Sequence, residues 1–253
     1  MPLRKFIILT AFLASGLLTS ARAQTPADDL KEAQRLTRVA QVAQQERRFV
    51  DAIKAFQTIA VVAKGSPKTV LDAKLAIGEL YMTLGKFDEA AAAAREAISL
   101  DANSAGAQNN LGEALGELKQ YQAALEAFQR AVALDGNYLK ARYNVGVTYD
   151  RLGRLKYAEF VYRILVRDHP GFAIGYDSLA VVLSRSGRAR EAIPLHEKAI
   201  SLDPNDPSFY YNFGVSYLVL GDLRAAQEQQ KRLHNLDPAM AEHLALVIAK
   251  HRQ

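Results

Sequence analysis

The chain repeats its own pattern at a fixed distance. The segments YNVGVTYDRLG at 143–153 and YNFGVSYLVLG at 211–221 agree at seven of eleven positions, and the second is offset from the first by 68. Because this offset is twice 34, the chain aligns as consecutive rows of that length without an insertion between them. The five rows start at Leu71, Ala105, Leu139, Ala173 and Pro207. Self-similarity at this period predicts a stack of identical supersecondary units rather than one or two ordinary globular domains.

Each row has the pattern of two helices that approach each other closely. Small residues recur at one position in each half of the row, and large apolar residues recur three or four positions away, which places them on one helix face. The small positions are Gly78, Gly112, Gly146, Ala180 and Gly214 in the first half, and Ala90, Ala124, Ala158, Ala192 and Ala226 in the second. Small side chains at matched depth allow the two backbones to come together.

Glycines and prolines separate the helices. A glycine ends the first helix in four rows (Gly85, Gly153, Gly187 and Gly221), and a proline follows the second helix in three (Pro170, Pro204 and Pro238). Lys119 replaces the glycine in the second row, which predicts a looser turn there. Asn205 or Asp206 is expected to cap the helix that begins near Pro207. Pro194 lies inside a predicted helix and is expected to kink it.

This pattern resembles the tetratricopeptide repeat family, whose 34-residue helix-turn-helix has small, large and proline positions in these places. The resemblance implies an all-α fold, a right-handed α-solenoid. Five tandem repeats would occupy 71–240, divided as 71–104, 105–138, 139–172, 173–206 and 207–240. A degenerate repeat is expected at 33–70, where RRFVDAIKAFQTI mirrors GKFDEAAAAAREAI, after a short N-terminal segment at 24–32. Residues 241–253 are expected to form a capping helix.

The first 23 residues have the layout of a secretory signal peptide. Arg4 and Lys5 precede an uncharged run at 6–18, and Ala21-Arg22-Ala23 provides a cleavage site before Gln24. The alternative is an uncleaved anchor, but the run is short of the roughly 20 residues that a spanning helix needs. We therefore expect an exported protein, periplasmic or secreted, that is not inserted in a membrane after cleavage.

The amino-acid composition excludes several kinds of site and partner. The chain has no cysteine, so disulfides, thiolate metal sites and acylation after a lipoprotein signal are excluded. Without the predicted signal the net charge falls from +5 to +2, and both signs are mixed throughout, so no nucleic-acid partner is expected.

No motif points to an enzyme. The five histidines form neither an H-x-x-x-H pair nor an H-E-x-x-H motif, and the chain contains no G-x-S-x-G and no phosphate-binding glycine loop. We predict no catalytic residue, no metal and no cofactor. A hydrolase or metal protein with an unrecognised site is the remaining alternative in this class.

The resemblance implies that the first helix of each repeat lines a concave groove. Asn110, Asn144 and Asn212 share one groove column, interrupted by Ala76 and Ser178, and resemble the asparagine ladder of the O-linked N-acetylglucosamine transferases. The alternative is that asparagine is simply common at this place in the family. The other predicted groove residues are Lys140, Tyr143, Val147, Arg151, Val181, Arg185, Tyr211 and Val215.

The groove columns also change in charge along the chain. Asp72, Glu79, Glu113 and Glu117 make the early rows acidic, and the basic residues come later, which would orient a bound segment. Leu75 and Glu79 stand where the carboxylate clamp of chaperone-binding members has a lysine and an asparagine, so recognition of a free peptide C-terminus is disfavoured.

Two functions follow from this sequence. The first is a non-enzymatic interaction module that binds a peptide segment or a protein surface in the groove, with envelope assembly or secretion as the setting that the resemblance suggests. The alternative is a self-associating scaffold, a homo-oligomer formed through N-terminal helices that carry Leu30, Leu36 and Val39.

Overall fold

The computed structural model describes residues 25–251, and this part of the chain is built from α-helices without a strand. The predicted signal peptide at 1–23 lies outside the described residues. None of the described helices combines the length and the apolar character needed to cross a lipid bilayer. The helices are α1 (Pro26–Gln45), α2 (Phe49–Val62), α3 (Pro67–Thr83), α4 (Phe87–Leu100), α5 (Ala105–Glu117), α6 (Tyr121–Leu134), α7 (Leu139–Arg151), α8 (Leu155–Asp168), α9 (Ala173–Arg185), α10 (Ala189–Leu202), α11 (Pro207–Val219), α12 (Leu223–His234) and α13 (Pro238–His251).

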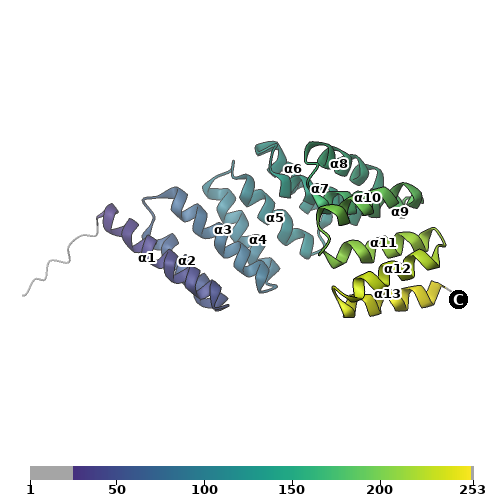
Figure 1. The fold of residues 1–253 in the computed structure, drawn as a ribbon. Coiled ribbons are helices and arrows are strands. Elements are labelled where there is room, and N and C mark those ends of the chain that lie inside the picture. Colours follow the sequence, from purple (N-terminus) through teal and green to yellow (C-terminus); the bar gives the residue numbers. More distant parts are fainter. Residues whose placement is uncertain (1–24, 252–253) are drawn as a thin grey trace, which may run out of the picture.

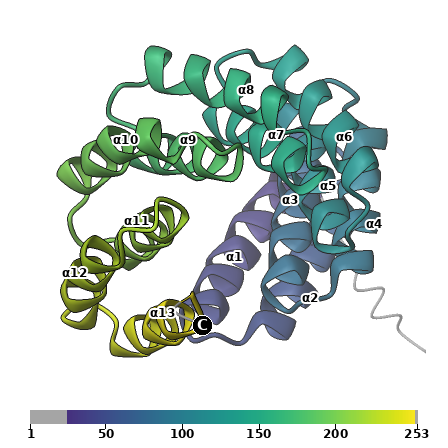
Figure 2. The same cartoon turned by 90° about the vertical axis from the view of Figure 1, so that its right-hand side faces the viewer.

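Successive helices pack side by side and the stack curls into a superhelix (Figure 1). Seen along the stack, the odd-numbered helices from α1 to α11 line the inside of the curve and the even-numbered helices lie outside (Figure 2). From α3 to α11 the backbone of each inner helix also comes close to that of the next inner helix, whereas the backbones of the described outer helices stay further apart. The predicted all-α solenoid of tetratricopeptide-like repeats is confirmed.

The turn inside each unit has the same geometry throughout. A residue just after each inner helix has a positive φ, from 69° to 77° at the four predicted glycines. Lys119 adopts the same conformation with φ 60°, and the amide of Gln120 donates to the carbonyl of Leu115 at 2.9 Å, the bond that closes the equivalent glycine turns. The prediction of a looser turn at Lys119 is therefore wrong. Neighbouring units fix the helix ends, so the lysine accepts the left-handed conformation at a steric cost.

Side-chain caps begin several helices. The Asp206 carboxylate accepts a hydrogen bond from the Ser208 amide at 2.9 Å, and Pro207 is the first residue of α11, so the predicted cap lies at Asp206. Ser104 caps α5 in the same way through the amide of Ala107. Thr25 and Asp28 form a reciprocal capping box at the start of α1.

The degenerate repeat at 33–70 is four residues longer than the period of 34, and its last four residues, 67–70, are helical. α3 begins at Pro67, one turn before Leu71, while α5 and α7 begin at the first residue of their rows. The insertion therefore lengthens an inner helix and leaves the spacing of the units intact. Pro194 lies inside α10, which continues to Leu202.

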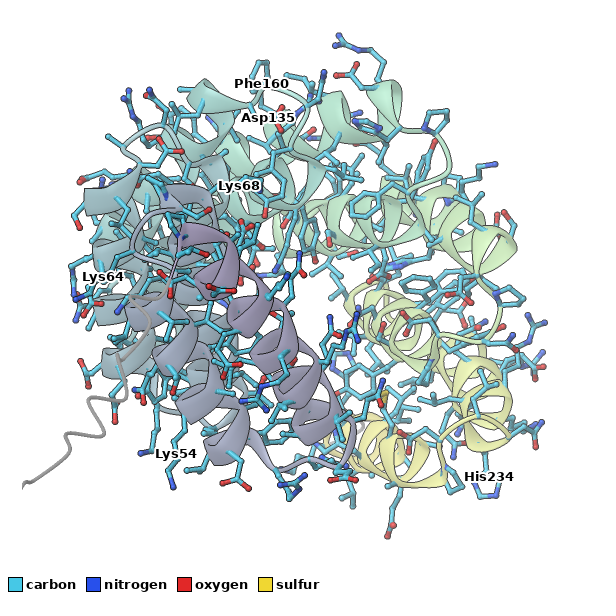
Figure 3. All side chains as sticks on the ribbon, turned by 90° about the vertical axis from the view of Figure 1, so that its left-hand side faces the viewer. Lys54, Lys64, Lys68, Asp135, Phe160 and His234 are labelled. Carbon is cyan, nitrogen blue, oxygen red and sulfur yellow. The ribbon has the colours of Figure 1, made fainter. Side chains whose placement is uncertain are left out.

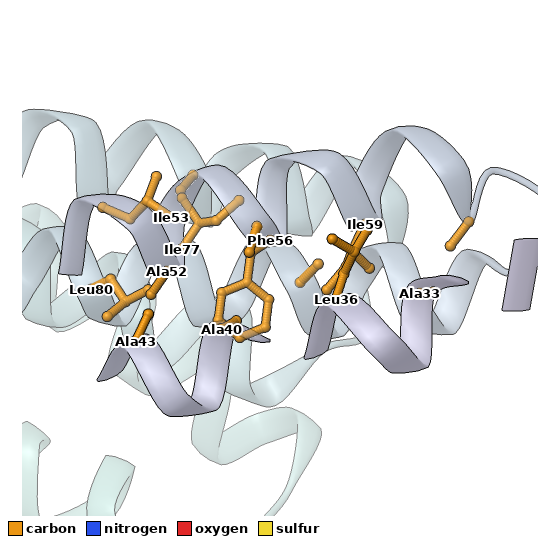
Figure 4. Close-up of a cluster of buried hydrophobic side chains, with 14 residues drawn as sticks. Ala33, Leu36, Ala40, Ala43, Ala52, Ile53, Phe56, Ile59, Ile77 and Leu80 are labelled. Atoms are coloured by element: carbon orange, nitrogen blue, oxygen red, sulfur yellow. The ribbon is translucent and has the colours of Figure 1, made fainter. Parts of the chain in front are cut away.

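The small residues are buried between the helices. The alanines at the small position in the second half of each row form a second small column, and they are at most 1 % exposed. At the N-terminal end, Ala40, Ala52 and Phe56 belong to one buried apolar cluster that joins α1, α2 and α3 (Figure 4). α13 closes the opposite end, with Leu244 buried and packed against Gly214.

The glycines of the first column face different neighbours. A Cβ on Gly146 would lie 2.5 Å from the ring of Tyr162, and one on Gly112 would lie 2.6 Å from the ring of Phe128. A Cβ on Gly78 would meet nothing closer than 3.8 Å, because Ala94 replaces the ring in that unit. Glycines of this column therefore pack against an aromatic ring in two units, whereas Gly78 has only small groups near it.

This difference predicts opposite effects for one substitution at two glycines. Gly146→Ala should destabilise the protein by about 1 to 3 kcal/mol, because the buried Tyr162 ring has to move. Gly78→Ala should stabilise it by about 0.5 to 1 kcal/mol, because alanine is the better helix former and fits the space. Urea unfolding followed by circular dichroism measures both, and shifts of the same sign would contradict the packing described.

Candidate binding groove

Three hollows open on the inner layer, and α7 contributes to all of them. The first, about 420 Å³, lies between α5 and α7, and the second, about 390 Å³, lies between α7, α9 and α11. The third, about 610 Å³, lies at the N-terminal ends of α7 and α9. Val147 and Arg151 line the first two, and Tyr143 lines the second and the third. The inner face of α7 is therefore the centre of the groove.

Most of the predicted groove residues gather at these hollows. Lys140, Tyr143, Asn144, Val147, Arg151, Val181 and Asn212 line at least one of them. Asn110, Arg185, Tyr211 and Val215 line none of the three. Tyr211 instead stacks on His243 of α13 and shares a 2.9 Å hydrogen bond with its Nδ1 atom.

The asparagine column forms hydrogen bonds within the protein. Asn144 donates to the Oδ1 atom of Asn109 at 3.1 Å, and Asn212 donates to the Oδ2 atom of Asp177 at 2.7 Å. Each bond joins residues 35 apart, from one inner helix to the next, and the hydroxyls of Tyr143 and Ser178 lie 3.3 Å apart at the same place.

Asn110 is the exception in this column. Leu75 lies 35 residues before Asn110, and its side chain has no polar atom that could accept a hydrogen bond. Asn110 itself is 7 % exposed. The inter-repeat contact that engages Asn144 and Asn212 is therefore not available to Asn110.

Two groove cations are held in ion pairs between units. The Lys140 ammonium lies 2.7 Å from the Glu113 carboxylate, and Arg185 pairs with Asp150. Burial alone would lower the pKa of Lys140, but the hydrogen bond and charge of Glu113 outweigh it and raise that pKa. Burial raises the pKa of Asp150 in spite of Arg185 and Arg151. The predicted change of charge along the groove is thus partly neutralised by bonds between units.

Aromatic contacts fix Tyr143 at the rim of the hollows. Its ring meets Phe172 edge-on with centroids 5.6 Å apart and lies 5.9 Å from the buried ring of Tyr162. Such edge-to-face contacts orient a ring as well as bury it. Tyr143 consequently offers a fixed wall to a ligand, and burial raises the pKa of its hydroxyl.

A buried polar chain runs beneath the groove through three helices. The Nδ1 atom of His196 lies 2.8 Å from Oδ1 of Asp177, and its Nε2 atom lies 2.8 Å from the hydroxyl of Ser216. That hydroxyl is 2.7 Å from the hydroxyl of Ser184. Because a carboxylate only accepts, the Nδ1 atom donates to it.

These hydrogen-bonded residues have the order of an aspartate-histidine-serine triad, but their side chains are not accessible to a substrate. Ser216 is 1 % exposed, His196 is fully buried, and the serine hydroxyl is already engaged on both sides. A nucleophile must reach a substrate carbonyl, so the arrangement serves to join α9, α10 and α11. Within residues 25–251 no cluster of three or more histidine and carboxylate side chains is placed to hold a metal ion.

Sequence reasoning missed this chain of residues. Asp177 and His196 are 19 residues apart, and His196 and Ser216 are 20 apart, so no short motif joins them. The sequence did indicate that His196 is buried, through its position in the row. His196 occupies the row position of Phe128 and Tyr162, which pack inward.

Known families match most of the repeat region. Three family models, each described as tetratricopeptide repeat, match residues 75–138 and 117–171, residues 176–208 and residues 197–228. The chain belongs to the tetratricopeptide repeat family. No curated protein sequence matches it.

Solved structures of other proteins share the fold. A tetratricopeptide repeat protein from Parabacteroides merdae has a TM-score of 0.75 at 17 % identity, over 88 % of this chain and 87 % of that one. Pseudomonas aeruginosa pilF has a TM-score of 0.69 at 16 % identity, over 86 % and 98 %. MamA has a TM-score of 0.58 at 29 % identity, over 67 % and 97 %. The first two, at such low identity, show the fold alone.

The buried histidine gives a prediction about stability. His196→Phe keeps an aromatic ring against Phe213 but removes the two hydrogen bonds of His196, so that Oδ1 of Asp177 loses its partner and the Ser216 hydroxyl keeps only Ser184. Losing these bonds in a buried place, one of them to a charged group, should destabilise the protein by about 2 kcal/mol or more, measured by urea unfolding.

The control is His234→Phe on the outer side of α12, where the side chain reaches solvent (Figure 3). That change should alter the free energy of unfolding by less than about 0.5 kcal/mol. Equal effects of the two substitutions would show that the buried chain contributes nothing specific.

Proposed function

We propose that this tetratricopeptide repeat protein is a non-enzymatic scaffold that holds a peptide segment or a partner surface against the inner faces of α5, α7 and α9. The observation that carries the proposal is the convergence of three hollows on α7. Their volumes fall in the range of ligand sites. Their walls mix apolar side chains with polar groups that inter-unit bonds hold in place, which suits recognition more than chemical conversion.

The fold supports this role. Stacked units build an extended concave surface whose shape is fixed by the contacts between neighbours, and such surfaces serve protein binding. YrrB, which shares the fold with a TM-score of 0.53 at 20 % identity over 68 % of this chain, is described as a tetratricopeptide repeat protein with an unusual peptide-binding site. The present groove is a candidate for the same class of ligand.

We also propose that the protein works after export, in the periplasm or outside the cell, in envelope assembly or secretion. The support is the sequence of residues 1–23, with a basic start, an uncharged run and Ala21-Arg22-Ala23 before Gln24. The absence of cysteine fits packing as the source of stability in such a compartment.

Self-association through the N-terminal helices is the second candidate. On α1 and α2 the apolar side chains of Leu30, Val39, Val42 and Val50 are between 45 % and 56 % exposed, whereas Leu36, also predicted for this surface, is buried in the core. They lie at the open end of the stack, where no further described helix covers them. A second copy would bury these side chains and extend the core.

One crosslinking experiment separates the candidates. A photoreactive amino acid replaces Val147 in the groove, Val39 on α1, or the exposed Lys198 on the outer helix α10 as the control, in the full chain in its native cells. Position 147 should capture a second protein and position 198 should not. Adducts between two copies of this chain from position 39, with nothing captured at 147, would instead establish the self-associating scaffold.

The same samples test export. The N-terminal sequence of the tetratricopeptide repeat protein in its crosslinked adducts should begin at Gln24, since the predicted signal is removed during export. A species that retains Met1 and stays with the cytoplasmic fraction would contradict the proposed location while leaving the scaffold role open.

A further inference from the structure

Arg151 holds a distinctive place among the groove cations. It lies in the last turn of α7, it is exposed, and it lines both the first and the second hollow. The side chain therefore stands at the junction of the two spaces. Val147, one turn earlier on the same helix, lines the same two hollows.

The other cations predicted for the groove have partners from neighbouring units. Lys140 is paired with Glu113, and Arg185 is paired with Asp150. Arg151 makes no ion pair with any residue of the described chain. Its guanidinium presents five donors in a planar fork, a geometry that matches a carboxylate with two parallel hydrogen bonds.

The acidic groups around Arg151 are mostly engaged elsewhere. Glu113 binds Lys140 and Asn144, Asp150 binds Arg185, and Asp177 binds His196 and Asn212. Glu117, in the first hollow on α5, is exposed and has no ion-pair partner in the described part of the chain, and Lys119 lies on the same wall. The first hollow therefore carries both an unpaired carboxylate from α5 and, where it meets the second hollow, the unpaired cation from α7.

From this arrangement we propose that Arg151 selects the partner, by binding an acidic side chain within an extended segment whose neighbouring residues are apolar. The inference rests on the proposed groove function and specifies its ligand. The acidic side chain pairs with the guanidinium at the junction. The flanking apolar residues lie over Val147 and, where the second hollow meets the third, over Tyr143 and Ile174.

The same arrangement gives the segment a direction. A basic residue in the segment is favoured on the side of the first hollow, near Glu117, and apolar residues are favoured towards the third hollow, beside Tyr143 and Ile174. The acidic group is a side chain rather than the chain terminus, because Arg151 stands between two hollows and a segment paired with it would extend into a hollow on either side.

A peptide-display selection tests the proposal. Random peptides, fused at their C-termini to phage so that no free carboxylate is presented, are selected on the intact protein. The same library is selected on Arg151→Gln, on Arg151→Glu, and on the control Arg130→Glu, whose side chain is exposed on the outer helix α6. Circular dichroism verifies that each variant keeps the helical fold.

The expected result is enrichment of peptides with an aspartate or glutamate beside apolar residues, on the unmodified protein and on Arg130→Glu. Arg151→Gln should bind the selected peptides about tenfold or more weakly, since a charge-assisted hydrogen bond is lost. Arg151→Glu should enrich basic peptides instead.

Two outcomes overturn the inference in different ways. Enriched peptides without an acidic preference, or the same peptides selected on both Arg151 variants, would refute the role of Arg151 while the groove remains a peptide site. No enrichment on the unmodified protein over a surface without it would refute both the role of Arg151 and the binding of a peptide segment in the groove.

Discussion

Each helical pair in this protein has an apolar face that it cannot bury by itself. Burial is completed only when the next pair packs on it, so the fold depends on contacts between adjacent units rather than on one central core. The alanines of the second small column are all at most 1 % exposed in the completed stack. α13 supplies the final cover, with Leu244 against Gly214.

The inner layer adds a polar form of the same contact. Asn144 and Asn212 reach back to the preceding inner helix, and the ion pairs Glu113–Lys140 and Asp150–Arg185 also join adjacent units. These bonds set the distance and rotation between inner helices and thereby shape the groove. They also engage side chains that would otherwise meet a ligand, which is why Arg151 stands out.

The sequence was sufficient for the architecture because each repeated column records a burial requirement. Glycines, alanines and large residues at matched positions predict the helix pairs, and the polar residues before Pro207 predict a cap at Asn205 or Asp206, of which Asp206 forms it. The turn at Lys119 was misjudged because a favourable residue type is only a preference, which tertiary contacts can override. The sequence does not predict the extra turn of α3, because an insertion does not by itself show which helix or loop becomes longer.

The details of the groove were less predictable for a physical reason. The column position shows that Asn144 faces the inner side, but not that its amide turns to Asn109, since that depends on side-chain rotamers across two helices. The buried contact of His196 with Asp177 and Ser216 likewise joins three helices. A single sequence carries no direct record of such long-range pairs.

The central claim, that the length of the repeat sets the register of the stack, is tested most directly by internal deletion. Removing 115–148 takes out one complete repeat length and joins Ala114 to Tyr149, so each side chain of the fused inner helix keeps its column. Removing 115–146 stops two positions short of that length and rotates the second part of the helix by about 200°, from roughly 100° per residue. Thermal unfolding followed by circular dichroism should show a cooperative transition for the first protein and none for the second. Similar transitions in both, or a loss of folding in both, would contradict the account.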